Sequence, residues 1–200
     1  RKQVGKVIRD DLVIQEFIDT AEAQLKEIRK KVLSNAGVIV FVDATRDGDN
    51  HATRVAKEIK NRKRSVIVAI QETGCQEQID KFVEGEEGDY LIVKNSAGAG
   101  LDCSRIKVVV DLSSVRQFAS CEQRWNRGGT PTNGKGGRVT VATLITPADI
   151  FSDEIFDSIY TRQGGECRET WAEVVDTIYV PKQPGPQPPE NPNFVEAIGD

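Results

Sequence analysis

This chain lacks the patterns that mark membrane and secreted proteins. No apolar run approaches the roughly eighteen residues that a membrane-spanning helix needs. The start, RKQVGKVIRDDL, is basic and then acidic, without the apolar segment of a secretory signal. His51 is the only histidine, so any catalytic triad built on histidine would depend on it alone. We therefore expect a cytoplasmic protein with no membrane partner, in which His51 is a structural or surface residue.

The cysteines and the methionines are equally uninformative about a metal or redox function. The chain has four cysteines without a Cys-x-x-Cys pair or a zinc-ligand spacing, so we predict no metal site and interpret them as thiols in a reducing compartment. The chain begins at Arg1 and contains no methionine. We expect either a fragment of a longer protein or a sequence from which modified methionines are left out.

Net charge gives no general sign of a nucleic-acid partner. The chain has 200 residues and a formal net charge of −4, so no overall basic field attracts a polyanion, although a local basic surface would suffice. The segment 60–65, KNRKRS, is one basic run that could hold a nucleic-acid backbone. A charge run at the C-terminal end of a helix is more often solvated and favourable to the helix dipole, and we favour that interpretation.

Apolar patterning predicts alternating helices and strands. Apolar side chains spaced along residues 8–33 predict a long amphipathic helix. Continuous β-branched runs such as GVIVFVD are typical of buried parallel strands, and their alternation with helices implies βαβ crossovers. We predict an α/β fold with a mostly parallel sheet and strands at 37–43, 65–70, 89–94, 106–112 and 137–146, and helices near 51–62, 76–85, 115–125 and 147–160.

The C-terminal part has a different composition. Residues 181–193, PKQPGPQPPENPN, hold six of the eight prolines, which excludes a helix or central strand and indicates an extended linker, with a ligand for an SH3-type domain as the less favoured alternative. We divide the chain into a connecting helix at 1–35, an α/β domain at 36–162 and a short helix with a proline-rich tail at 163–200.

Two loops of the predicted sheet contain residues suited to a phosphate ligand. Ligands of parallel α/β sheets bind beyond the carboxyl ends of the strands. The strand at 89–94 leads into KNSAGAGLD, where Gly98 and Gly100 would let backbone N–H groups approach a phosphate. Asp102 could accept a hydrogen bond from a ribose hydroxyl or hold an arginine. A tight turn would explain this stretch equally well.

The second loop is rich in arginine. The helix at 115–125 leads into EQRWNRGGT, with Arg124 and Arg127 three residues apart. Arginine binds phosphate oxygens in a bidentate manner, and an arginine finger stabilises the charge that develops during phosphoryl transfer. The alternative is a surface helix end whose arginines interact only with the helix dipole.

Taken in order, these segments resemble the second RecA-like lobe of a superfamily 2 helicase. GVIVFVDAT resembles the strand around motif IV, SAGAGLD resembles the end of motif V, and QRWNRGGT resembles motif VI, commonly Q-R-x-G-R-x-G-R. The resemblance covers about residues 36–146 and implies a RecA-like three-layer sandwich. It assigns three groups of residues: catalytic Gln123, Arg124 and Arg127, with Arg127 as the finger; nucleotide-binding Gly98, Gly100 and Asp102; nucleic-acid-binding Lys94 and Ser96.

The chain departs from the pattern of the family at three positions. Lys94 stands where motif V usually has threonine, Asn126 where motif VI has glycine, and Thr130 where motif VI has its final arginine. If the chain takes part in a complete ATPase, Arg124 or Arg138 would have to replace that last arginine.

The resemblance also implies a missing partner lobe. The chain has no G-x-x-x-x-G-K-[ST] phosphate loop and no DExx run, and we interpret GGTPTNGKGG as a mobile, exposed connector. The resemblance therefore implies an ATP-dependent helicase whose ATP and Mg²⁺ are held mainly by an upstream RecA-like lobe, and a fragment that is inactive alone. Its nucleic acid is expected to be DNA rather than RNA.

Two other functions stay open at this stage. One is a degenerate, non-catalytic helicase-like module that binds nucleic acid or a protein partner. The other is a stand-alone Rossmann-like enzyme, which is disfavoured because no G-x-G-x-x-G follows the first predicted strand.

Overall fold

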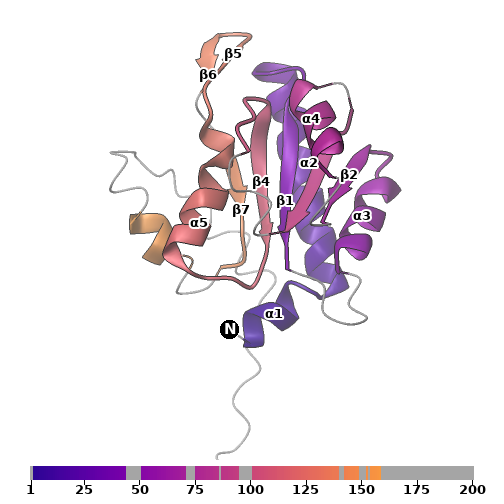
Figure 1. The fold of residues 1–200 in the computed structure, drawn as a ribbon, viewed down its shortest axis with the longest axis vertical. Coiled ribbons are helices and arrows are strands. Elements are labelled where there is room, and N and C mark those ends of the chain that lie inside the picture. The colour runs from indigo at the N-terminus through magenta and orange to yellow at the C-terminus, as the bar shows by residue number, and fades with distance from the viewer. Residues whose placement is uncertain are drawn as a thin grey trace, which may run out of the picture. The chain divides into compact units, whose positions relative to one another are not determined.

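The computed structural model describes residues 2–43, 51–70, 75–85, 87–94, 101–139, 142–148, 152 and 154–158. Residues 1–165 form one compact unit, and residues 166–200, with the predicted proline-rich tail, lie outside the described part. The elements, in chain order, are α1 (Lys2–Val7), α2 (Asp11–Lys31), β1 (Gly37–Val42), α3 (His51–Asn61), β2 (Val66–Ala69), α4 (Gln76–Glu84), β3 (Tyr90–Lys94), β4 (Ile106–Leu112), α5 (Phe118–Trp125), the 3₁₀ helix η1 (Asn126–Gly129), β5 (Thr132–Gly134), β6 (Gly137–Val139) and β7 (Thr143–Ile145) (Figure 1).

The centre of the fold is a five-stranded parallel sheet. Its strand order is β2-β3-β1-β4-β7, and all four neighbouring pairs are parallel. Every residue of β1 and of β4 is buried, as expected for valine-rich strands covered on both faces. The predicted α/β fold and the strands predicted at 37–43, 65–70, 89–94 and 106–112 are confirmed.

Helices cover both faces of the sheet. Because successive strand residues point to opposite faces, Val38, Val40 and Val42 of β1 pack in one core cluster with α2 and α3. Ile39 and Phe41 pack in a second cluster with side chains of α4. The two clusters on either side of one sheet are the three-layer arrangement that the sequence predicted.

The first long helix is an integral layer of the domain. The helix predicted at 8–33 is α2, which begins at Asp11, and Asp10 caps it by accepting a 2.9 Å hydrogen bond from the Leu12 N–H group. Ile14, Ile18 and Leu25 of α2 are fully buried in the cluster shared with β1 and β4. The packing therefore joins α2 to the sheet.

His51 has a structural position at the start of α3. Its side chain is 1% exposed, and its Nε2 atom lies 2.9 Å from the carbonyl oxygen of Ile8. This contact joins the first turn of α3 to the end of α1, which agrees with the structural interpretation of the only histidine.

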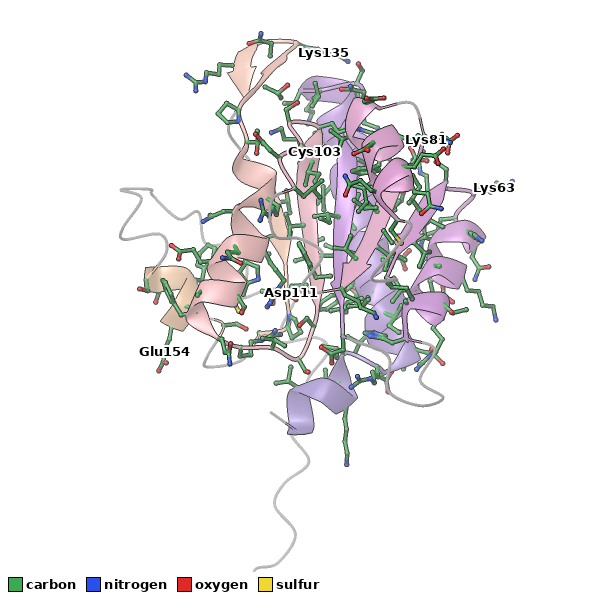
Figure 2. The ribbon with its side chains drawn as sticks, in the orientation of Figure 1. Lys63, Lys81, Cys103, Asp111, Lys135 and Glu154 are labelled. Atoms are coloured by element: carbon green, nitrogen blue, oxygen red, sulfur yellow. The ribbon has the colours of Figure 1, made fainter. Side chains whose placement is uncertain are left out.

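The prediction of a single strand at 137–146 is wrong. The segment forms two strands, with β6 paired antiparallel to β5 and β7 paired parallel to β4. The expected exposed connector contains the hairpin β5–β6, whose exposed turn residue Lys135 is labelled in Figure 2. Lys135 donates its N–H to the Val32 carbonyl at 2.7 Å and its ammonium to the Arg29 and Lys30 carbonyls at the C-terminal end of α2, where a cation is favourable.

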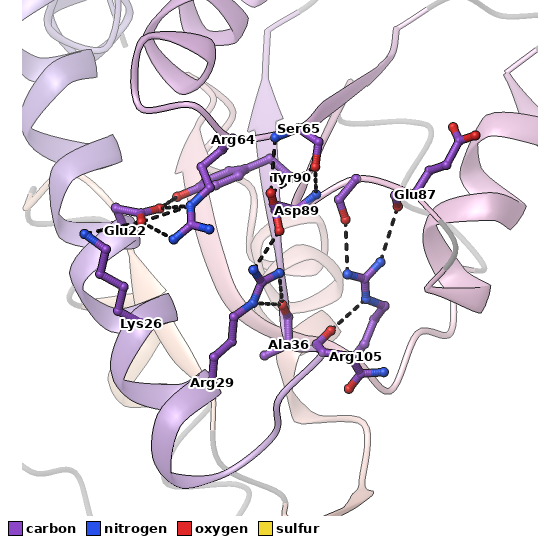
Figure 3. Close-up of polar contacts among 12 residues, drawn as sticks. Glu22, Lys26, Arg29, Ala36, Arg64, Ser65, Glu87, Asp89, Tyr90 and Arg105 are labelled. Carbon is purple, nitrogen blue, oxygen red and sulfur yellow. Dashed lines mark hydrogen bonds and ion pairs between the residues drawn. The ribbon is translucent and has the colours of Figure 1, made fainter.

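The basic run at 60–65 is partly used inside the fold. Arg62 bonds Asp19 at 2.7 Å, and Arg64 bonds both carboxylate oxygens of Glu22 through its Nε atom at 2.9 and 3.0 Å. The Tyr90 hydroxyl donates to the same carboxylate at 3.2 Å (Figure 3). These arginines hold α2 against the loop between α3 and β2, which leaves Lys60 and Lys63 as the exposed cations of the run.

Glu22 is expected to stabilise the fold in a pH-dependent manner. Burial acts to raise the pKa of Glu22, but the bonds and charge of Arg64, with Lys26 and Tyr90, outweigh it and hold the pKa below its usual 4.5. The stabilisation is therefore present above pH 4.5 and is lost as the pH falls through the lower, folded-state pKa. We expect Glu22→Gln to lower the free energy of unfolding at pH 7 by about 1–3 kcal/mol, because Arg64 loses its charged partner.

Urea unfolding between pH 7 and pH 3 checks this expectation. The difference between the wild type and Glu22→Gln should shrink below pH 4.5, whereas the exposed control Glu16→Gln on the same helix should stay within about 0.5 kcal/mol throughout. A difference that is constant over this pH range would contradict the role given to the carboxylate.

Candidate functional site

One face of β4 presents two buried charges at opposite ends of the strand. Lys107 and Asp111 are four residues apart, so they lie on the same face with Val109 between them, and both are 0% exposed. Figure 2 labels Asp111 near the end of β4 and Cys103 just before its start. Charges in a strand interior are unfavourable unless they are paired or hydrogen-bonded, and both find partners in the segment α5–η1.

At the carboxyl end of β4, Asp111 binds the end of α5. Arg124 Nη2 lies 3.0 Å and Nε 3.3 Å from Asp111 Oδ2, and Trp125 Nε1 donates to the same oxygen at 2.8 Å. Arg124 also donates to the Val115 carbonyl at 2.8 Å and is only 2% exposed. The structure thus gives Arg124, predicted as a catalytic residue, a buried position in which its guanidinium binds the protein itself.

At the amino end of β4, Lys107 binds the backbone of η1. Its ammonium donates to the Thr130 carbonyl at 2.6 Å and to the Gly128 carbonyl at 3.3 Å. Gly128 is pressed against the sheet: a Cβ atom there would lie 2.4 Å from the Ala142 Cβ and 3.3 Å from a Val109 methyl group. Burial lowers the pKa of Lys107. Only glycine fits at this point, and η1 is fixed tightly to β4.

Arg127 and Asp102 lie on two segments that are bonded to each other. Arg127 Nη1 donates to the Leu101 carbonyl at 2.8 Å, and Thr130 Oγ1 donates to Asp102 Oδ1 at 3.0 Å. Burial lowers the pKa of Arg127, and the charge of Asp102 opposes that effect. The structure therefore brings together the predicted finger and the predicted nucleotide-binding carboxylate.

The place of this pair differs from the expected one. The carboxyl edge of the sheet was predicted, but Thr130 also bonds Lys107, the second residue of β4, so the pair lies at the amino end of that strand. The topology explains the difference. Because β3 and β4 are both parallel to β1, the chain must return from the end of β3 to the start of β4, and Asp102 lies at the end of that return.

The other predicted site residues lie elsewhere or outside the described residues. Lys94 is the last residue of β3, paired with Val42 at the carboxyl edge and half-buried. Gln123 is exposed on α5, and Arg138 is exposed on β6 beside a depression of about 310 Å³ lined also by Pro131, Thr132 and Asn133. Ser96, Gly98 and Gly100 lie outside the described residues.

Sequence reasoning missed Lys107 and Asp111. Their signal was present in IKVVVDL, where two charged residues interrupt an apolar strand that must be buried on both faces. A buried charge requires a partner, and the arginine-rich segment that follows is the nearest source for Asp111. The partners of Lys107 are backbone carbonyl groups, which every residue has, so the sequence does not indicate which residues bind it.

Comparison with known proteins gives a result for structure alone. No protein-family model and no curated protein matches the sequence. Among solved structures, Dbp5 of S. cerevisiae bound to RNA and ADP BeF3 superposes with a TM-score of 0.53 at 18% identity, over 84% of this chain and 42% of that one. A C-terminal domain of Dbp5 bound to Gle1 and IP6 gives 0.52 at 19% identity, over 84% and 91%. The yeast DEAD-box splicing factor Prp28 gives 0.50 at 16% identity, over 76% and 31%.

These similarities establish the fold. The chain has a RecA-like fold, as the resemblance predicted, and shares it with the C-terminal domain of Dbp5. It covers 91% of the isolated Dbp5 C-terminal domain but 42% of the RNA-bound Dbp5 chain. Within the described residues, no helix is long and apolar enough to cross a membrane.

Proposed function

We propose that this chain is the C-terminal lobe of an ATP-dependent nucleic-acid helicase or translocase, acting in the cytoplasm. In this proposal, it supplies the motif V and motif VI residues of an ATP site that an upstream RecA-like lobe completes. The observation that supports it most directly is the pairing of the two segments, Arg127 with Leu101 and Thr130 with Asp102, on a helicase-type fold.

The chemistry of these two residues suits a nucleotide. One Nη atom of Arg127 is used by the Leu101 carbonyl, and the other can donate to a phosphate oxygen, where a guanidinium stabilises charge that develops during phosphoryl transfer. Asp102 is exposed and uses only Oδ1 for Thr130, so its second oxygen can accept a hydrogen bond from a ribose hydroxyl. Gln123 and the backbone at Gly98 and Gly100 complete the proposed set.

In this proposal, the upstream lobe holds Mg²⁺ and most of the phosphate contacts. Among the described residues, no group of three or more histidine, cysteine or carboxylate side chains is placed to hold a metal ion. ATP supplies the phosphoryl group that is transferred to water, and this chain contributes a guanidinium and a carboxylate beside it.

Nucleic acid is proposed to bind at the opposite edge. Lys94 ends β3 at the carboxyl edge of the sheet, away from Arg127 at the amino end of β4, and its ammonium can contact a backbone phosphate. Ser96 follows it in the chain and is assigned to the same contact. The neighbour Dbp5 was solved with RNA and with Gle1. For this chain, we propose single-stranded nucleic acid as the ligand, DNA in preference to RNA.

Measurement of ATP turnover by the complete protein tests the proposal. We expect turnover to rise at least tenfold on addition of single-stranded DNA, and less with RNA, because nucleic acid and ATP would close the two lobes together. A protein without any ATP turnover would contradict the proposed enzyme.

A second function is favoured by two observations in the site. Arg124 is buried against Asp111, and the final arginine of motif VI is replaced by Thr130, which is itself bonded to Asp102. Both reduce the cations available for a phosphate, as expected of a degenerate lobe that binds nucleic acid or a protein without catalysis. Salt-sensitive binding to single strands without stimulated ATP turnover would support this alternative.

A further inference from the structure

The segment that carries Arg127 is attached to β4 at two points. Asp111 holds Arg124 and Trp125 on one side of it, and Lys107 holds the carbonyl groups of Gly128 and Thr130 on the other. Arg127 lies between the two attachments. The first attachment is an ordinary buried ion pair, but the second is a lysine bonded to the backbone.

The surroundings of Lys107 are unusual for a lysine. It is 0% exposed, and the hydrogen bonds described for its ammonium go to carbonyl oxygens. Its titratable neighbour is the thiol of Cys103, itself 1% exposed, and burial raises the pKa of that thiol, which keeps it neutral near pH 7. Burial of an ammonium without a carboxylate is unfavourable, and an apolar side chain of similar length would avoid that penalty. Lys107 is therefore expected to stabilise the core less than an apolar side chain of similar length would.

The two bonds fix the direction of η1. The carbonyl groups of Gly128 and Thr130 both accept from the Lys107 ammonium. This one side chain therefore sets the orientation of the backbone from Gly128 to Thr130. In that orientation, Arg127 meets the Leu101 carbonyl and the Thr130 side chain meets Asp102. Gly128 fits so closely against Ala142 and Val109 that η1 cannot shift toward the sheet.

We propose that Lys107 is a positioning residue, which acts through the Gly128 and Thr130 carbonyl groups to hold η1 and thereby keeps Arg127 beside Leu101 and Asp102. The positioning itself is a property of this lobe. Only the role of the positioned Arg127 toward ATP rests on the proposed function.

A matched pair of lysine variants tests this role. Lys135 also donates its ammonium to two backbone carbonyls, but it is exposed on the hairpin. In the 200-residue chain, we expect Lys107→Met to speed solvent exchange of the buried Arg127 Nε–H proton at least tenfold, as measured by NMR. The amides of β1 should keep their protection, and the melting temperature should stay equal or rise. Lys135→Met should leave Arg127 unchanged, and Lys107→Arg, which keeps a cationic donor, should restore most of its protection.

Two outcomes would overturn the proposal. Arg127 exchange in Lys107→Met that equals the wild type would show that the lysine does not position it. Loss of protection at Arg127 and β1 together, with a lower melting temperature, would show that Lys107 serves global stability only.

The complete protein supplies an independent measurement. There, Lys107→Met should lower kcat for ATP at least tenfold and change KM less than twofold, because it displaces a group that acts in the transition state. A change confined to KM would contradict this. A wild type without ATP turnover would remove the proposed function and leave the NMR result on positioning intact.

Discussion

Arg127→Ala is expected to reduce ATP turnover by the complete protein by about 10³-fold or more, the range found for loss of an arginine finger. The guanidinium has one described hydrogen bond, to the Leu101 carbonyl at 2.8 Å. Its removal should therefore lower the free energy of unfolding by only about 1 kcal/mol. The measurement is steady-state turnover at saturating nucleic acid, with a thermal melt of the same sample.

Two comparisons separate a direct role from a general effect. Arg127→Lys keeps a cation but not the planar fork, so it should recover only a small part of the turnover. Arg54→Ala removes an arginine on α3 that bonds Asp11 and the Arg9 carbonyl, and it should keep turnover within about twofold of the wild type, because it touches neither segment of the site. Normal turnover by Arg127→Ala would remove the finger assignment.

The layers of the fold were predictable because their signals are local. The β-branched runs of β1 and β4 and the apolar spacing of α2 each report burial within a few residues of chain. The hairpin β5–β6 was missed because GRVTVATLIT reads as one continuous strand. Its first part pairs with β5 instead, and the hairpin turn bonds the end of α2 through Lys135, about a hundred residues away. No local pattern records that contact.

The site was only partly predictable for a similar reason. Asp102 and Arg127 were both assigned to the nucleotide, and the described contacts bring their segments together. The helix that was predicted to end at 125 does so, because α5 ends at Trp125, and η1 follows it. Arg124 then points to Asp111 and Arg127 to Leu101. The change from α-helix to 3₁₀ helix, which spacing alone does not reveal, decides which arginine is available to a ligand.

Asp111→Asn is expected to cause the largest loss of stability among single changes in this lobe. Asp111 is 0% exposed and accepts hydrogen bonds from Arg124, Trp125 and the Ser113 N–H group. The amide keeps the shape but removes the charge that two buried guanidinium groups face, Arg124 at 3.0 Å and Arg116 at 3.7 Å from Asp111 Oδ2. Loss of such a charged partner typically costs about 3–5 kcal/mol. Urea unfolding at pH 7 measures it, with Asp80→Asn, which is exposed on α4, expected within about 0.5 kcal/mol of the wild type.

A double-mutant cycle shows whether the loss comes from the uncompensated charge. If it does, Asp111→Asn combined with Arg124→Met should recover part of the loss, because one of the two buried cations at Asp111 is removed together with its partner while Arg116 remains. Strictly additive losses would instead mean that Asp111 acts through Trp125 and the backbone, independently of Arg124. In the complete protein, the double variant should regain stability without regaining full turnover, since neither Arg124 nor Asp111 is then present to anchor the segment from which Arg127 projects.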